Sequence, residues 1–346
     1  MLELARELLP LLRRGEAVAV VTVARVARSA PRGAGAAMAV TGAGEVIGSI
    51  SGGCVEGDAV LLATEVLATG LPRRATLGFT DDAAHAAGLA CGGSVEVIVH
   101  RVTPDDEVAI GALEAADADL PAAVGIVLGG AAMGRAVPLE PGAAETTRTL
   151  ATDMLAVVHL PRPRLVVIGA GEHAMALARV ASAAGFIVAV CDVWERLVTP
   201  ERFPSAELLV VATPADELET LVGASPQRAA VCVLTHDERV DVPAIARALR
   251  LDVGFVGAMG ARSTVAHREV LLRAAGVTDE EVARLRSPLG LDLGGVSPEE
   301  SAIAALAEIV AARHGGSGAP LRDGDGPLHR RTAAPTCATD FEGAAR

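Results

Sequence analysis

The segment that most constrains the fold is a glycine loop near the middle of the chain. It reads Gly-Ala-Gly-Glu-His-Ala over residues 169–174, follows a short apolar run and opens an alanine-rich stretch with helical spacing. A second apolar run, 186–191, comes next and ends at Asp192. The order of strand, glycine loop, helix, strand and acidic residue is the pattern of a dinucleotide-binding βαβ unit.

Three positions of this unit have a physical role in binding. Gly169 permits the tight turn after the strand, and Gly171 lets a pyrophosphate approach the amino end of the helix. Asp192 follows about 20 residues later, where a carboxylate accepts a hydrogen bond from a ribose 2′-OH and repels a 2′-phosphate. NAD is therefore favoured over NADP. The alternatives are another phosphate-bearing ligand, or a loop kept for packing alone.

Short apolar runs alternate with helical segments from residue 164 onwards. The runs occupy 165–168, 187–190, 208–212, 231–234 and 253–256. This alternation predicts a parallel sheet with helices on both faces. We therefore expect an α/β protein in which residues 161–315 form a Rossmann-like doubly wound parallel sheet.

The amino-terminal part has a different pattern. We expect helices over 2–13 and 57–68, and strands over 17–26, 38–41, 45–50, 75–79 and 94–99. Residues 1–100 are accordingly predicted to be a smaller α+β domain, 101–160 a connector and 316–346 a largely flexible tail.

A cysteine with glycines beside it lies between a predicted strand and a predicted helix. Gly52 and Gly53 precede Cys54, and because glycine carries no Cβ, backbone N–H groups and the helix dipole can stabilise a thiolate there. Cys91 has a similar Cys-Gly-Gly setting, and Arg32 supplies one cation to a loop of small residues that could hold an anion. The alternative is that Cys54 is a small buried residue and Arg32 an ordinary loop residue.

Two further loops follow predicted strands at the carboxyl edge of the sheet, where ligands bind in this architecture. His236, next to Asp237, could act as a general base, a metal ligand or a hydrogen-bond donor. Gly257, Gly260 and Arg262 offer amides and one guanidinium to an anion. The competing interpretations are a structural His-Asp pair and a tight turn with a surface arginine.

Composition argues against several classes of protein. The formal net charge of −13 disfavours nucleic-acid binding, and the 2% content of Phe, Trp and Tyr disfavours stacking on bases. The chain has no apolar run of roughly 18–20 residues and no signal-peptide pattern, so we expect no membrane span and a cytoplasmic protein. Its five cysteines lack the spacing of disulfide frameworks or zinc sites.

Seven motifs form a recognisable set. They are Ser-Ala-Pro-Arg at 29–32, Gly-Ser-Ile-Ser-Gly-Gly-Cys-Val-Glu-Gly at 48–57, Cys-Gly-Gly at 91–93, the loop 169–174, Thr-His-Asp at 235–237, the loop 257–262, and Pro-Leu-Gly-Leu-Asp-Leu-Gly at 288–294. Together they resemble the XdhC/CoxI family. The departures are Ala30, which stands where the family usually has a hydroxyl residue, and Glu172, which precedes His173.

The resemblance implies an accessory protein for molybdenum hydroxylases of the xanthine dehydrogenase or carbon monoxide dehydrogenase type. Such a protein binds molybdenum cofactor, as molybdopterin or its dinucleotide, supports sulfuration of the cofactor by a cysteine desulfurase and delivers it to the apoenzyme. It is a maturation chaperone rather than the dehydrogenase itself, and a homodimer is compatible with this role.

We hypothesise that Cys54 contacts the molybdenum–sulfur end of the cofactor, while Gly169, Gly171 and the adjoining Glu172 and His173 take its phosphate. The alternative is an NAD-dependent oxidoreductase acting on a small metabolite, with Asp192 on the ribose and His236 as acid or base. A scaffold that docks hydroxylase and sulfurase without touching cofactor is a third possibility.

Overall fold

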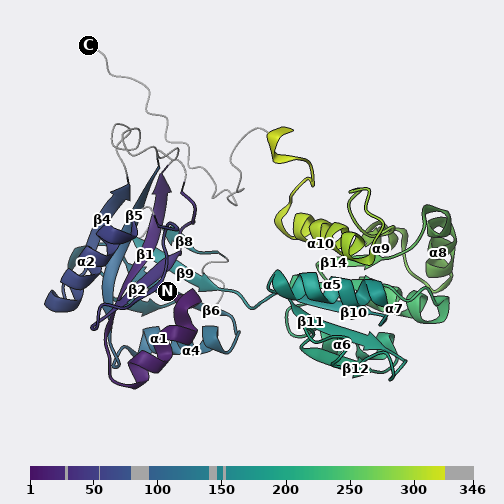
Figure 1. Cartoon of the computed structure of the whole chain (residues 1–346), viewed down its shortest axis with the longest axis horizontal. Helices are drawn as coiled ribbons and strands as arrows, with labels where there is room; N and C mark the ends of the chain where they lie inside the picture. Colours follow the sequence, from purple (N-terminus) through teal and green to yellow (C-terminus); the bar gives the residue numbers. More distant parts are fainter. Residues whose placement is uncertain (28–29, 54, 79–92, 140–145, 151–152, 324–346) are drawn as a thin grey trace, which may run out of the picture. The chain divides into compact units, whose positions relative to one another are not determined.

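The computed structural model describes residues 1–27, 30–53, 55–78, 93–139, 146–150 and 153–323. The chain divides into two compact units, Met1–Pro161 and Arg162–Arg346 (Figure 1). Cys54, Cys91 and most of the carboxyl-terminal tail lie outside the described residues.

The first unit is built on an antiparallel five-stranded sheet with the order β3-β2-β1-β5-β4. The central strand β1 is buried on both faces because its side chains alternate between two apolar clusters. Val18 and Val20 belong to one cluster, and Ala19 and Val21 to the other. The strands are β1 (Val18–Ala27), β2 (Ala37–Thr41), β3 (Val46–Gly48), β4 (Arg73–Gly78) and β5 (Ser94–Val102).

Helices cover both faces of this sheet (Figure 1). Helix α2 (Glu56–Thr69) buries Ala59, Ala63 and Val66 against one face. The opposite face packs on η1 (Leu2–Leu4), α1 (Ala5–Arg13) and α4 (Glu107–Asp117). The start of α2 is therefore held close to the sheet, directly after the segment that carries the Gly-Gly-Cys motif.

Residues 101–160 differ from the predicted connector, because they add secondary structure to the first unit. They contain α4 and a four-stranded antiparallel sheet with the order β7-β6-β9-β8. Its strands are β6 (Ala122–Val127), β7 (Ala136–Pro138), β8 (Arg148–Leu150) and β9 (Met154–His159), with η2 (Gly130–Ala132) between β6 and β7. Apolar side chains of β6 and β9 join the same buried cluster as α1 and α4.

The second unit has a six-stranded parallel sheet with the order β12-β11-β10-β13-β14-β15. Counted from the first strand of this unit the order is 3-2-1-4-5-6, which is the doubly wound arrangement of dinucleotide-binding folds. The α/β fold predicted from the alternating pattern is thereby confirmed. The strands are β10 (Arg164–Ile168), β11 (Ile187–Asp192), β12 (Leu208–Val211), β13 (Ala229–Val233), β14 (Phe255–Ala258) and β15 (Leu285–Arg286).

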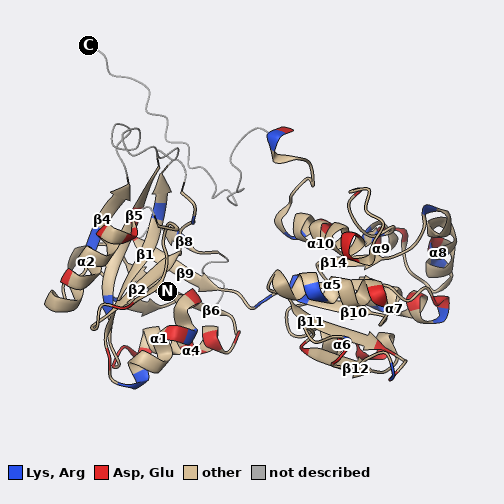
Figure 2. Ribbon diagram, viewed as in Figure 1, with Lys and Arg blue, Asp and Glu red and all other residues tan. Residues whose placement is uncertain are grey.

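Helices form a layer on each face of this sheet. One layer contains α5 (Glu172–Ala183) and α10 (Pro298–His314), and the other contains α6 (Pro214–Val222), α7 (Glu238–Arg250) and α8 (Arg262–Ala274). The remaining short elements are η3 (Pro226–Arg228), α9 (Asp279–Ala283) and η4 (Leu321–Asp323). Figure 2 shows the charged residues mainly on the helices, which leaves an aliphatic sheet between the layers. Within the described ranges no helix is long and apolar enough to span a membrane.

Candidate functional site

The carboxylate of Glu56 organises the backbone on both sides of Cys54. Its two oxygens accept hydrogen bonds from the backbone N–H groups of Ile50, Ser51, Gly52, Gly53 and Val55 over 2.8–3.3 Å. The hydroxyls of Ser49 and Ser51 also donate to it, each over 2.6 Å. Seven donors from residues 49–53 and 55 therefore converge on one side chain.

This arrangement bears on the expectation that backbone N–H groups near Cys54 stabilise a thiolate, because those of Gly52 and Gly53 donate to Glu56. Burial alone would raise the pKa of the Glu56 carboxyl, but the hydrogen bonds from Ser49, Ser51 and the backbone lower it to about 2. The carboxylate thus stays ionised and holds the amides of Gly52 and Gly53, so an anionic ligand would compete with it. Gly52 and Gly53 have φ values of +83° and +123°, which favour glycine at both positions.

Arg32 links Glu3, near the amino terminus, to Ser49. Its guanidinium donates hydrogen bonds to the carbonyl oxygen of Ser49 and, over 2.6 Å, to the Glu3 carboxylate. Glu3 in turn accepts the N–H of Ala37 over 2.7 Å. The positive charge of Arg32 is thereby paired with Glu3 in a partly exposed ion pair, and an anion at this position would need to displace Glu3.

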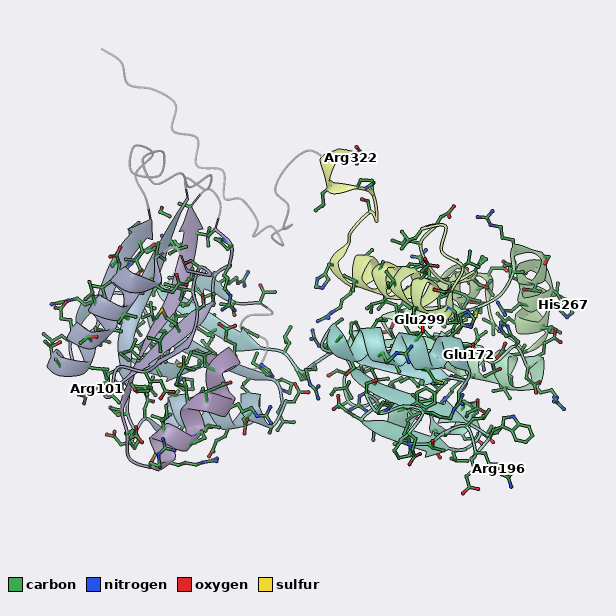
Figure 3. All side chains as sticks on the ribbon, viewed as in Figure 1. Arg101, Glu172, Arg196, His267, Glu299 and Arg322 are labelled. Carbon is green, nitrogen blue, oxygen red and sulfur yellow. The ribbon has the colours of Figure 1, made fainter. Side chains whose placement is uncertain are left out.

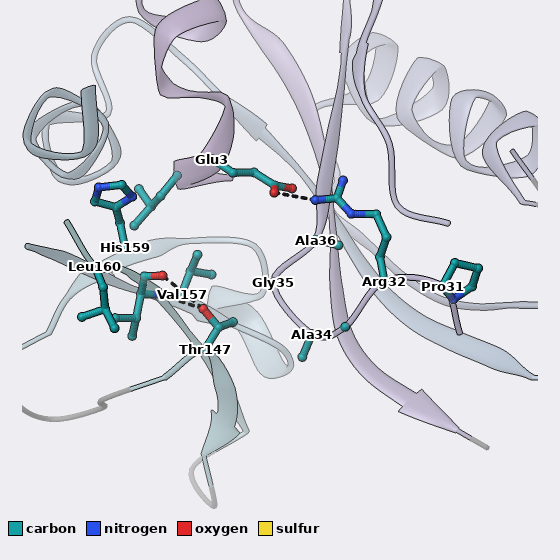
Figure 4. Close-up of a pocket in the computed structure, with 13 residues that line it drawn as sticks. Glu3, Pro31, Arg32, Ala34, Gly35, Ala36, Thr147, Val157, His159 and Leu160 are labelled. Carbon is teal, nitrogen blue, oxygen red and sulfur yellow. Dashed lines mark hydrogen bonds and ion pairs between the residues drawn. The ribbon is translucent and has the colours of Figure 1, made fainter. Parts of the chain in front are cut away.

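A cavity of about 400 Å³ opens beside this ion pair within the first unit. Figure 4 shows Glu3 and Arg32 on one side of it, with Thr147 and His159 across from them. Gly35 lies at its edge with φ +90°, and a Cβ there would come within 2.5 Å of the Thr147 side chain. The cavity therefore depends on glycine at this turn.

In the second unit, the glycine loop connects β10 to α5 as predicted. Gly169 has φ +107°, and a Cβ on it would meet Thr235 at 3.0 Å, so its role is close packing against the loop after β13. Gly171 is different, because nothing lies within 4 Å of the place where its Cβ would be. No side chain of the described residues caps the amino end of α5, and Glu172 is exposed in its first turn (Figure 3).

Asp192 lies at the end of β11 and bonds to this loop. Its carboxylate accepts the N–H of Ala170 over 2.8 Å and that of Trp194 over 3.2 Å, and the residue is only 7% exposed. Arg202 donates to the carbonyl of Ala170 over 2.9 Å. Asp192 therefore braces the glycine loop, and its expected contact with a ribose stays a prediction.

His236 and Asp237 follow β13, but their surroundings differ. His236 is exposed and has φ +69°, a left-handed conformation that is uncommon for a non-glycine residue. Asp237 caps α7 by accepting the N–H of Arg239, and the hydrogen bonds from Arg239 lower the pKa of the Asp237 carboxyl. The Asp237 carboxylate thus accepts hydrogen bonds from Arg239. The role of His236 and Asp237 as acid and base stays a prediction.

A buried ion pair lies beneath these loops. Arg268 donates to the carbonyl of Met259 over 2.8 Å and approaches the Asp241 carboxylate at 3.9 Å, and Thr235 donates its hydroxyl to the same carboxylate. Burial raises the pKa of the Asp241 carboxyl. A Cβ on Gly260 would come within 3.1 Å of Arg268, whereas Arg262 is exposed at the start of α8.

The structure groups the predicted residues into two sites, one in each unit. Arg32, Gly52 and Gly53 gather around the Cys54 segment, and Gly169, Gly171 and Asp192 gather around the glycine loop. The described cysteines, Cys191 and Cys232, are buried, and burial raises the pKa of both thiols, to about 11 for Cys191. Among the described residues, no cluster of three His, Cys, Asp or Glu could hold a metal.

Sequence reasoning missed Glu56, Glu3, Arg268 and Asp241 as organising residues. The signal for Glu56 was present, because an acidic residue at the start of a helix that follows a Ser-x-Ser-Gly-Gly run can turn back onto the amides before it. The other three act between elements distant in sequence, and a single sequence carries no local sign of them.

Glu56→Gln tests the organising role of the carboxylate. We expect the variant to destabilise the first unit by about 2–3 kcal/mol at pH 7, because it loses the ionised form that the seven donors stabilise. That contribution is present above pH 4.5 and is lost as the pH falls towards 2, so the difference from wild type should shrink over this range.

The measurement is urea unfolding followed by circular dichroism, with Trp194 fluorescence reporting the second unit separately. Glu65→Gln on the same helix is the matched control, because Glu65 makes an exposed ion pair with Arg73 that should contribute less than about 1 kcal/mol. Equal stability of Glu56→Gln and wild type at pH 7 would contradict the assignment.

Two family profiles match the chain, one in each unit. The profile of the XdhC and CoxI family matches residues 11–79, and the profile of the XdhC Rossmann domain matches residues 165–309. A crystal structure from Bacillus halodurans, described as a xanthine dehydrogenase, aligns with a TM-score of 0.69 at 24% identity over 89% of this chain and 95% of that chain. It supports the fold.

Three relatives align with the sequence. The uncharacterized protein YqeB of Escherichia coli is 34% identical over 46% of this chain, and the match spans 29% of that protein. A Bacillus subtilis protein named as a probable xanthine dehydrogenase subunit is 29% identical over 88% of this chain and 95% of that protein. The molybdenum cofactor insertion chaperone PaoD of Escherichia coli is 25% identical over 87% and 85%. The chain belongs to the XdhC and CoxI family.

Proposed function

We propose that this protein is an accessory chaperone that binds molybdenum cofactor, supports its sulfuration and delivers it to a molybdenum hydroxylase of the xanthine dehydrogenase or carbon monoxide dehydrogenase type. Its partners on this proposal are the hydroxylase apoenzyme and a cysteine desulfurase. Support comes from a relative named as a molybdenum cofactor insertion chaperone and another named as a probable xanthine dehydrogenase subunit, both matched over most of their length.

The observation that carries the proposal is the fit of the glycine loop to a phosphate-bearing ligand. The space beside Gly171 is open, and the amino end of α5 has no side-chain cap, so backbone N–H groups and the helix dipole are available to a phosphate. Molybdopterin and its dinucleotide both carry phosphate, and when bound they supply molybdenum held by dithiolene sulfurs. Soft sulfur ligands suit this metal, which is the reason for assigning Cys54 to its vicinity.

On this proposal the first unit interacts with the end of the cofactor that carries molybdenum and sulfur. The Glu56 network holds the backbone on both sides of Cys54 in one conformation. A cysteine presented from a braced segment can approach a ligand without the entropy cost of ordering a loop.

Cys54→Ala tests the role of the thiol. We expect protein purified anaerobically from a molybdenum-replete host to contain molybdenum and pterin in near-equal amounts, and the variant to lose most of both. Molybdenum is measured by mass spectrometry and pterin by fluorescence after oxidation. Cys232→Ala removes a thiol from the core of the second unit instead and should retain the load. Full loading and full activation of a partner hydroxylase by Cys54→Ala would refute the assignment.

Gly171→Ala tests the phosphate end. The added methyl group meets no protein atom within 4 Å, but it stands where a phosphate would approach the helix, so cofactor retention should fall sharply. Alanine is a poorer N-cap residue than glycine, so we expect Gly171→Ala to lose some stability, but no more than about 1 kcal/mol. Gly111→Ala in α4 is the control, since its Cβ also meets nothing within 4 Å. Unchanged retention in Gly171→Ala would contradict phosphate binding at this loop.

An NAD-dependent oxidoreductase acting on a small metabolite is the second candidate, and the 3-2-1-4-5-6 strand order with Asp192 at the end of the second strand favours it. Trp194, the single tryptophan of the chain, is 67% exposed two residues beyond Asp192 and reports on this edge. Quenching of its fluorescence by micromolar NADH, in protein that contains neither molybdenum nor pterin, would support the oxidoreductase. No response to NADH would leave the chaperone as the better account.

A further inference from the structure

A cavity of about 260 Å³ lies beside the glycine loop of the second unit. One side is the first turns of α5, where His173 and Leu177 line it, and another is the loop after β14 with Met259 and Gly260. The segment 289–295 and the first half of α10 close the rest. The Pro-Leu-Gly-Leu-Asp-Leu-Gly motif, which the phosphate site does not use, therefore forms a wall of this cavity.

This wall is fixed by backbone contacts. The N–H of Leu289 donates to the Ala258 carbonyl over 3.1 Å, and the N–H of Leu291 donates to the Ala304 carbonyl over 3.1 Å. Gly290 donates its N–H to the Glu308 carboxylate over 2.7 Å and has φ +112°, with Ala304 3.3 Å from where a Cβ would lie. This wall of the cavity is thus attached by hydrogen bonds to β14 and α10.

The lining suits a flat ring. Its inner surface is aliphatic, so a planar heterocycle can be enclosed there without unpaired polar atoms of the protein. The apolar side chains that line it include Leu177, Leu234, Met259, Leu289, Ala302 and Ala305. A volume of this size holds a single ring system rather than a whole dinucleotide.

The polar groups select the kind of ring. Glu300 is already committed, because it accepts the N–H groups of Val296 and Ser297 over 2.8 and 3.0 Å. Asp292 is exposed on the lining and makes no hydrogen bond or ion pair to other residues in the described parts of the chain. An ionised carboxylate only accepts hydrogen bonds, so Asp292 favours a ring with adjacent N–H donors and repels an anionic group.

We propose that this cavity binds the 2-amino-4-oxopyrimidine ring of a pterin, with Asp292 accepting hydrogen bonds from the ring N–H and the exocyclic amino group. The inference deepens the proposed function and rests on it, since it assigns the heterocycle of the cofactor to this cavity while its phosphate lies at Gly171. His173, which follows the first residue of α5 and lines the cavity, stands between the two.

Pterin and lumazine provide a matched pair of probes, because lumazine has a carbonyl oxygen in place of the 2-amino group. Their dissociation constants are measured by equilibrium dialysis with the cofactor-free full-length protein. We expect wild type to prefer pterin by about tenfold or more, as a carboxylate paired with two donors discriminates against an analogue that presents an acceptor.

Asp292→Asn should reduce this preference to about twofold or less, because an amide can donate to the lumazine oxygen as well as accept. Asp252→Asn is the control: it removes a carboxylate just before β14, at the opposite end of the strand, and should keep the wild-type preference. Equal affinities in wild type, an unchanged preference in Asp292→Asn, or no pterin binding at millimolar concentration would each overturn the inference.

The outcome is separable from that of the proposed function, because neither probe carries phosphate or metal. A pterin preference that depends on Asp292, in a protein that never carries molybdenum, would refute the chaperone and keep the ring site. Normal molybdenum loading without any pterin preference would refute the ring site alone.

Discussion

The convergence of seven hydrogen-bond donors on the Glu56 carboxylate is the interaction on which the candidate site of the first unit depends. Five backbone amides and two hydroxyls in a short glycine-rich segment would otherwise need water, and the segment would have no single conformation. Because the carboxylate belongs to the first residue of α2, the helix and the segment are fixed together. Arg32 extends this order to the amino terminus through Ser49 and Glu3.

In the second unit, close packing fixes the loops at the carboxyl edge of the parallel sheet. Gly169 packs against Thr235, and Gly257 would clash with Leu289 if it carried a Cβ. Beneath them the pair of Arg268 and Asp241 is nearly fully buried and holds the Met259 carbonyl. A buried pair of this kind is weak evidence for net stability, but removing one partner would leave an uncompensated buried charge.

Sequence patterns predicted those parts of the structure that depend on interactions between residues close together in the sequence. The strands predicted from the alternating apolar runs and the glycine loop before α5 are present as expected. The second sheet of the first unit was missed because β7 and β8 are three-residue strands without a readable period. The ion pair of Arg268 depends on packing between helices, which a single sequence does not display. The role of Glu56 was missed although the Ser-x-Ser-Gly-Gly run before it carried a local signal.

The central claim is that the braced segment presents Cys54 to the molybdenum–sulfur end of the cofactor. The most direct measurement is the rate at which iodoacetamide alkylates Cys54, followed by peptide mass spectrometry, in cofactor-loaded and cofactor-free protein under anaerobic conditions. The account predicts strong protection of Cys54 in the loaded protein, with full reactivity restored once the cofactor is released. The same alkylation rate in loaded and empty protein would contradict it.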